Sequence, residues 1–126
     1  WKQSLPHAPY LFVLAFGEYQ VYKDKWGKVP VNYYTFPKYF KDVDKVFGKT
    51  PAMMEFFSKL LGFDYPWEKY DQIVAYDYTA GAMENTGASV FYEPLFCNQQ
   101  DLIDRDFEYI IAHELFHQWF GDLVTC

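Results

Sequence analysis

The sequence has 126 residues, which suits one ordinary domain or part of a larger one. Hydrophobic residues make up 51% of it and aromatic residues 23%, so the chain has ample material for a packed core and is not a disordered tail. Its 11 basic and 17 acidic side chains give a net charge of −6, which argues against a nucleic-acid partner because such a partner requires a basic face.

The first part of the chain predicts strands. An apolar run over residues 10–16 and a partly alternating run over residues 18–25 predict two strands with a short connection. A turn is expected over residues 25–28. Residues 29–36 are rich in β-branched and aromatic side chains and predict a third strand, in which Pro30 favours the edge of the sheet because proline has no N–H to donate.

Two helices are predicted next. Apolar side chains recur at helical spacing over residues 37–47 and again over residues 53–61. Thr50 is the expected N-cap of the second helix, with Pro51 at its first helical position. Gly62 is expected to end that helix, since glycine is the usual residue just past a helix C-terminus.

The second half of the chain returns to strands and closes with a helix. Short strands are predicted at residues 72–76 and 88–92, on either side of a glycine-containing segment. A long helix should run from residue 101 or 104 to residue 120, and Gly121 should end it. The order of strands, helices, strands and helix predicts an α+β fold. No stretch of 18 apolar residues occurs, so we expect no transmembrane segment.

The last predicted helix carries residues suited to metal chemistry. His113 and His117 are four residues apart, so an α-helix places both imidazoles on one face, where both can reach one zinc ion at roughly 2.0–2.1 Å. In such motifs the glutamate after the first histidine, here Glu114, does not bind the metal but takes a proton from the attacking water and passes it to the leaving amine. The surrounding apolar residues predict a buried helix, in which unpartnered polar groups are costly, so a bound metal is favoured over a purely structural role.

The third ligand of such a site stays open at this point. A catalytic zinc ion needs three protein ligands and one open position. The carboxylates in principle available are Asp77, Glu84, Glu93 and Asp122. None has a helical placement relative to His117 that singles it out.

A second motif, Gly81-Ala82-Met83-Glu84-Asn85, precedes the last predicted strand. Gly81 allows the backbone to come close to a ligand, and Glu84 offers a carboxylate that can pair with a cation. Taken alone, the segment is more typical of a plain glycine turn with an exposed acid.

Together, the two motifs change that interpretation. The segment Gly81–Asn85, followed by His113–Thr125 with the sequence HELFHQWFGDLVT, closely resembles the aminopeptidase N family of zinc metallopeptidases, which is of the gluzincin type and whose relatives include leukotriene hydrolase. Residues 10–19 and 63–71 are similar to the same family, so the resemblance covers nearly the whole chain. It implies the N-terminal half of a thermolysin-like catalytic domain, with a mixed sheet and the HExxH helix.

The resemblance also implies a division of the chain. Residues 1–20 would be the last strands of an N-terminal β domain, and residues 21–126 would form the N-terminal part of the zinc-peptidase catalytic domain. By the same resemblance, His113 and His117 are zinc ligands and Glu114 is the general base. The family's third ligand, a glutamate, and its transition-state tyrosine lie further downstream than Cys126, so we expect this segment alone to be inactive and to bind zinc weakly.

The resemblance assigns the second motif to the substrate. Glu84 would hold the free α-amino group of a peptide, which places the first peptide bond over the zinc. Gly81 and Ala82 would line the peptide backbone as an added edge, Met83 would wall the pocket for the first side chain, and Asn85 belongs to the same substrate-binding loop.

The function implied is therefore that of a zinc-dependent aminopeptidase acting on peptides with a free N-terminus. Two alternatives remain. An epoxide-opening hydrolase is disfavoured because that branch carries glycine at the position of Ala82, and a catalytically silent scaffold is disfavoured because the HExxH residues are intact. Relatives often have asparagine where this chain has Asp122.

Overall fold

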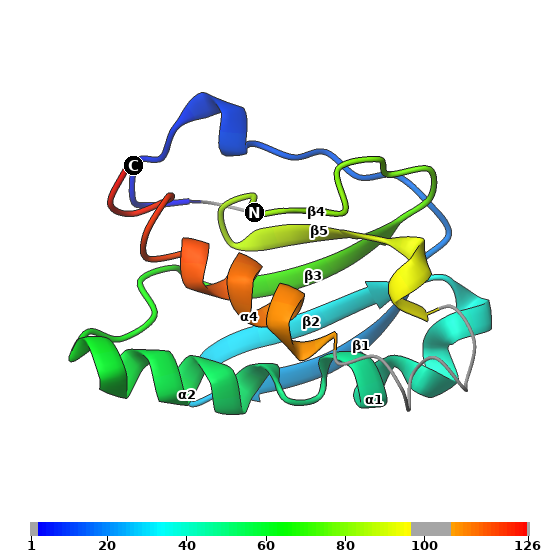
Figure 1. Ribbon diagram of the computed structural model, residues 1–126, viewed down its shortest axis with the longest axis horizontal. Coiled ribbons are helices and arrows are strands. Elements are labelled where there is room, and N and C mark those ends of the chain that lie inside the picture. Colours follow the sequence, from blue (N-terminus) through cyan, green and yellow to red (C-terminus); the bar gives the residue numbers. More distant parts are fainter. Residues whose placement is uncertain (1–2, 97–106, 126) are drawn as a thin grey trace.

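The computed structural model describes residues 3–96 and 107–125, which form a mixed sheet with helices on one face (Figure 1). The strands are β1 (Gln20–Trp26), β2 (Val29–Thr35), β3 (Tyr70–Ala75), β4 (Ala82–Met83) and β5 (Ala88–Tyr92). The α-helices are α1 (Val43–Phe47), α2 (Thr50–Leu61) and α4 (Glu108–His117), and the 3-10 helices are η1 (Pro9–Leu11), η2 (Pro37–Asp42) and η3 (Glu93–Phe96). The predicted α+β class with a mixed sheet is confirmed.

The sheet has the strand order β1-β2-β3-β5-β4. The β1–β2 and β5–β4 pairs are antiparallel, whereas β2–β3 and β3–β5 are parallel. A parallel pair needs a crossover connection, and α1 and α2 supply it between β2 and β3. The short strand β4, which is made of the second and third residues of the Gly81–Asn85 motif, is therefore the edge strand beside β5.

The strand predicted over residues 10–16 is wrong. The chain forms η1 and then runs on without strand structure up to β1, as the blue segment above the sheet in Figure 1 shows. A strand requires a neighbour to bond its backbone groups, and no strand of the described residues pairs with this segment. Only Leu11 is buried, while Phe12, Leu14 and Phe16 are 66%, 68% and 83% exposed. Whether residues 1–20 belong to a separate domain stays a prediction.

The prediction that Pro30 marks a sheet edge is also wrong, because β2 lies between β1 and β3. Pro30 is opposite Lys25 in the hairpin, next to the pair that closes the two-residue turn. At that position the backbone N of a strand residue points away from its hairpin partner. The register with β3 begins only at Val31, opposite Tyr70, so the missing N–H of Pro30 deprives no strand of a hydrogen bond.

The helix predicted over residues 37–47 is divided into η2 and α1, which meet at Asp42 with φ −106° and ψ 0°. Thr50 is the first residue of α2 and not its cap, because its hydroxyl donates to the Gln72 side chain of β3 at 2.7 Å. Pro51 lies in the first turn, as predicted. Gly62 ends the helix in the left-handed conformation, with φ +63°, and its N–H donates to the Lys59 carbonyl, which confirms that prediction.

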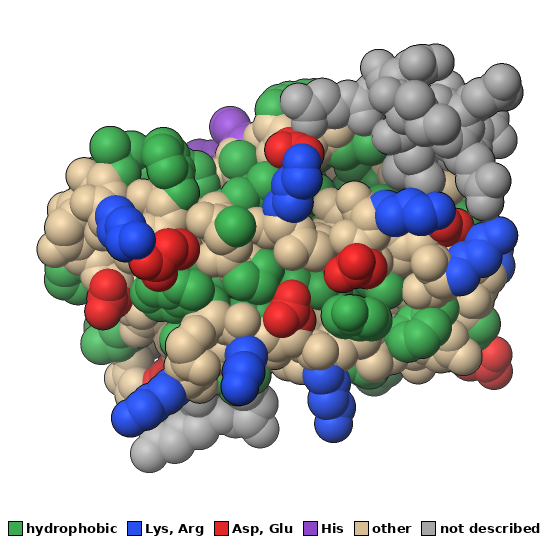
Figure 2. Space-filling model, turned by 90° about the horizontal axis from the view of Figure 1, so that it is seen from below, with side chains coloured by type: hydrophobic (Ala, Val, Ile, Leu, Met, Phe, Trp, Pro, Cys, Tyr) green, Lys and Arg blue, Asp and Glu red, His purple; other side chains and the backbone are tan. Residues whose placement is uncertain are grey.

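The core lies between the sheet and the helices. Alternate residues of β2 and β3, among them Val31, Tyr33, Tyr70 and Val74, are buried on the face that the helices cover. Phe47 of α1 packs among them and is fully buried. On the outer side of α2, Figure 2 shows lysines interspersed with acidic and apolar side chains, and one i,i+4 pair, Lys59 with Glu55 at 2.7 Å, lies on this helix. α4 packs against α2 and β4.

Candidate metal centre

The two histidines of the HExxH motif lie on one face of α4, as predicted. Their Nε2 atoms are 3.1 Å apart, and the rings are nearly perpendicular, with an interplanar angle of 87°. Two ligand atoms of a tetrahedral ion with bonds of 2.0–2.1 Å are separated by about 3.3 Å. The Nε2 pair of His113 and His117 therefore fits two corners of a zinc site.

The orientation of the His117 ring is set by the turn that follows α4. Its Nδ1 lies 2.9 Å from the Phe120 carbonyl oxygen, so Nδ1–H donates to that carbonyl and leaves the Nε2 lone pair free for a metal. Gly121 makes this approach possible, because a Cβ there would come within 3.0 Å of Nδ1, and its φ of +138° disfavours any side chain.

The helix was predicted to run to Phe120, but α4 ends at His117, and the same turn explains the difference. The backbone N–H of Asp122 donates to the His117 carbonyl at 3.0 Å, and that of Val124 donates to the Trp119 carbonyl at 3.0 Å. These bonds fold the chain back at the end of the helix. The predicted start of this helix, at residue 101 or 104, lies outside the described residues.

Glu114 lies between the two histidines in the chain and is buried, with 5% of its surface exposed. Burial raises the pKa of its carboxyl group to about 7, and the negative charge of Glu84 acts in the same direction, whereas His117 opposes them. The pKa of the Tyr78 hydroxyl is raised by burial and then by the charges of Glu114 and Glu84. The structure thus brings the two predicted functional carboxylates, from separate motifs, into one electrostatic environment.

Asp122 is a third carboxylate in this environment and is 4% exposed. Burial raises its pKa to about 7; the charges of Glu84 and Glu114 add to this effect, and Thr86 and His117 oppose it. Glu84, Glu114 and Asp122 therefore interact electrostatically with one another and with His117, and a cluster of acidic groups attracts a cation.

We expect Asp122→Asn to stabilise the metal-free protein more at pH 8 than at pH 5. A folded-state pKa raised above the unfolded value of 3.8 favours folding fully only below that value, and this contribution is lost as pH rises from there through about 7. The neutral amide of the variant keeps this contribution at every pH. Asp122→Asn should therefore raise the free energy of unfolding at pH 8 by on the order of 2 kcal/mol. Melting temperatures of the wild type and the variant after zinc removal measure this gain. An equal difference at pH 5 and pH 8 would contradict the burial of a charge at Asp122.

The Gly81–Asn85 motif forms the strand at the sheet edge. Ala82 and Met83 pair with β5 on one side, and the Gly81 carbonyl accepts a hydrogen bond from the Tyr92 N–H at 2.9 Å. Gly81 has φ +78° and open space where a Cβ would stand, so its backbone conformation explains the glycine.

Asn85 is buried, and its amide donates to the Leu11 carbonyl at 3.1 Å. This contact ties the motif to the N-terminal segment. A contact of the Asn85 side chain with substrate stays a prediction, as do the substrate contacts of Gly81, Ala82, Met83 and Glu84.

No third ligand joins the two histidines within residues 3–96 and 107–125, where no group of three His, Cys, Asp or Glu side chains could hold a metal ion. Of the carboxylates left open by the sequence, Glu93 is engaged elsewhere, since it accepts a hydrogen bond from Lys38 at 2.6 Å and another from Tyr39. In the same described part of the chain, no helix is long and apolar enough to cross a membrane.

Two residues of this site were missed by sequence reasoning. Gln118, directly after His117, is fully buried and bonds to the loop of Glu84, and Thr86 lies beside Asp122. The signal for Gln118 was present, because a polar amide next to a predicted ligand in an apolar segment needs buried partners.

Residues 46–126 match the family model for the Peptidase family M1 domain. The chain therefore belongs to peptidase family M1. It is 35% identical to aminopeptidase N of Streptomyces lividans over 125 residues, a match that covers 92% of this chain and 14% of that protein. Mitochondrial aminopeptidase 2 of Saccharomyces cerevisiae is 32% identical over 120 residues, with coverage of 92% and 13%.

A third relative, glutamyl aminopeptidase of Rattus norvegicus, is 30% identical over 140 residues, with coverage of 99% of this chain and 14% of that protein. The chain thus spans only 13–14% of the length of these curated relatives. The resemblance to the aminopeptidase N family that its motifs indicated is confirmed.

Proposed function

We propose that this chain contributes part of the active site of a zinc-dependent aminopeptidase, which hydrolyses the N-terminal peptide bond of peptides. The observation that supports this most is the pair of Nε2 atoms 3.1 Å apart on α4, beside the buried carboxylate of Glu114. Membership of family M1 adds to the support. The activity is proposed for the complete protein, and the segment by itself is expected to be inactive because it offers two metal ligands where a catalytic site uses three.

The reaction needs a base close to the metal, and Glu114, between the two histidines in the chain, would be that base. Zinc, when bound, lowers the pKa of a water molecule to about 7. Glu114 takes the proton of the water that adds to the carbonyl carbon of the first peptide bond, and then gives it to the nitrogen of the departing peptide. The C–N bond breaks, and the products are a free amino acid and a peptide shortened by one residue. Burial suits Glu114 to this role because it raises the carboxylate's affinity for the proton.

Glu84 accounts for the preference for the first residue of the peptide. Its carboxylate pairs with the substrate's α-ammonium group, and an ion pair of this kind fixes the end of the peptide chain. Among the described residues, β4 pairs with β5 along one edge, so we propose that the other edge of Ala82 and Met83 receives a peptide backbone as a further strand. The spacing between Glu84 and the metal then selects the first peptide bond.

Removal of zinc tests this function. We expect the complete protein to release p-nitroaniline from amino-acid p-nitroanilides, and dialysis against 1,10-phenanthroline to lower the rate by about 100-fold or more because the attacking water is no longer activated. Added Zn²⁺ should restore the rate, and the non-chelating isomer 1,7-phenanthroline serves as the control. Unchanged turnover in protein that metal analysis shows to be free of zinc would end the proposal.

A further inference from the structure

The side chain of Gln118 lies at the junction of the metal helix and the substrate loop. It follows His117 directly and is 0% exposed. A buried amide has to find partners for two donor hydrogens and for its oxygen, since each unsatisfied group costs desolvation energy. Its partners therefore reveal what it holds in place.

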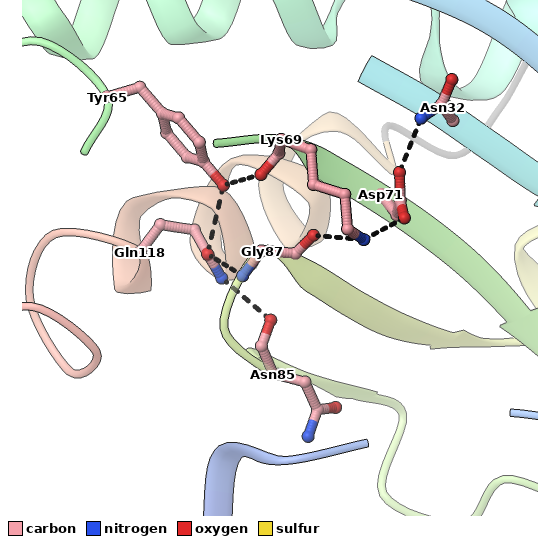
Figure 3. Close-up of polar contacts among 7 residues, drawn as sticks. All are labelled: Asn32, Tyr65, Lys69, Asp71, Asn85, Gly87 and Gln118. Atoms are coloured by element: carbon pink, nitrogen blue, oxygen red, sulfur yellow. Dashed lines mark hydrogen bonds and ion pairs between the residues drawn. The ribbon is translucent and has the colours of Figure 1, made fainter. Parts of the chain in front are cut away.

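The Gln118 oxygen and NH₂ group both have partners, most of them in the loop that carries Glu84, and Figure 3 draws those in Tyr65, Asn85 and Gly87. The Gln118 Oε1 accepts hydrogen bonds from the Gly87 N–H at 2.8 Å and from the Tyr65 hydroxyl at 3.3 Å. The Nε2 donates to the carbonyl oxygens of Glu84 at 3.1 Å and Asn85 at 3.3 Å. The reverse orientation of the amide would place NH₂ against the Gly87 N–H, so these contacts determine which atom is oxygen.

The far end of the loop is anchored to the sheet. The Gly87 carbonyl accepts the backbone N–H of Asp71 at 2.9 Å and lies 3.4 Å from the Lys69 ammonium group. The Asp71 carboxylate is paired with Lys69 and accepts a hydrogen bond from the Asn32 amide of β2 at 2.8 Å. With this end attached to β3, Gln118 is the described side chain that joins the loop backbone at Glu84 to the end of α4.

From these contacts we propose that Gln118 is a positioning residue that sets the distance between the metal ligands and the Glu84 carboxylate. The proposal rests on the proposed function, in which that distance selects the first peptide bond. His117 and Gln118 are consecutive, so the imidazole and the loop carbonyls share one rigid segment of backbone. A displacement of about 1 Å between two binding groups can cost 100-fold in rate. The hydrogen bonds of the Gln118 side chain therefore have a large effect on the rate through the position of Glu84.

A pair of metal-binding inhibitors separates positioning from general stability. Leucine hydroxamate carries the α-amino group, and 4-methylpentanohydroxamic acid is the same molecule without it. The ratio of their inhibition constants on the complete zinc protein measures the contribution of the ammonium site alone, because both bind the metal by the same group. We expect the wild-type protein to prefer the amino compound by about tenfold or more, as a charged hydrogen bond predicts.

Gln118→Met removes every hydrogen bond of the amide and keeps its length. We expect it to reduce the preference for the amino compound by about fivefold or more, while the inhibition constant of the des-amino compound changes by less than about twofold. Thr50→Val is the matched control, since it removes another buried hydrogen bond, to Gln72, far from the metal ligands in the chain. It should leave the ratio unchanged.

Gln118→Glu provides a second variant that keeps the acceptor for the Gly87 N–H and loses the donor to Glu84 and Asn85. It should also reduce the preference, and it decides the question if Gln118→Met yields no folded protein by circular dichroism. A wild-type preference that persists in the folded Gln118 variants would overturn the positioning role and leave the proposed function standing. A wild-type ratio near one would instead contradict the role of Glu84 in the proposed function.

Discussion

Glu114→Gln is expected to lower kcat of the complete protein by about 10²–10⁴-fold while the protein keeps its zinc. The amide has nearly the same size as the carboxylate and fits the same buried position, but it cannot take a proton from water. Because Glu114 lies between His113 and His117 without being a proposed ligand, the Nε2 pair should still hold the metal. Steady-state kinetics on an amino-acid p-nitroanilide and zinc analysis of the same samples measure both effects.

Glu108→Gln on the same helix is the matched control for that substitution. Glu108 lies in the first described turn of α4 and pairs with Lys49 at the surface. Surface ion pairs contribute about 0–1 kcal/mol, so this change should leave kcat within about twofold of the wild type. A Glu114→Gln protein that retains zinc and more than a tenth of the wild-type kcat would rule out Glu114 as the general base.

Phe47→Ala is expected to destabilise the chain by about 3–5 kcal/mol, which approaches the whole stability of a small domain. Phe47 is 0% exposed, and its ring lies 5.5 Å from that of Tyr33, 5.4 Å from Phe91 and 5.6 Å from Phe96. The truncation leaves a cavity between α1 and the centre of the sheet that these rigid rings cannot fill. Urea denaturation followed by tryptophan fluorescence measures the loss.

Phe56→Ala removes the same group from a position that is 60% exposed on α2. It should cost less than about 1 kcal/mol, because little surface leaves water at that position on folding. Equal losses for Phe47→Ala and Phe56→Ala would show that the core is not arranged as described.

Local sequence patterns were sufficient for the central elements of the fold. β5 was predicted with its observed bounds, and α2 was predicted to end at Gly62, because strand-favouring side chains such as Val90, Phe91 and Tyr92 and a glycine stop act through the backbone of a few neighbouring residues. The failed predictions depended on neighbours distant in sequence. Residues 10–16 have the composition of a strand, but no strand of the described residues pairs with them. Thr50 is of a residue type that favours helix caps, but its hydroxyl bonds to Gln72.

The sequence by itself determined which chemistry we propose for this protein. Histidines four residues apart must share one face of a helix, whatever that helix packs against, so the proposed pairing of His113 and His117 on one metal ion follows from helix geometry. Only the tertiary structure decided how Glu84 comes to lie near Glu114. These carboxylates are 30 positions apart by number, and no local pattern brings them together. The β4–β5 pairing and the buried amide of Gln118 do so, because hydrogen bonds between distant backbone groups exist only after the sheet and helix have packed.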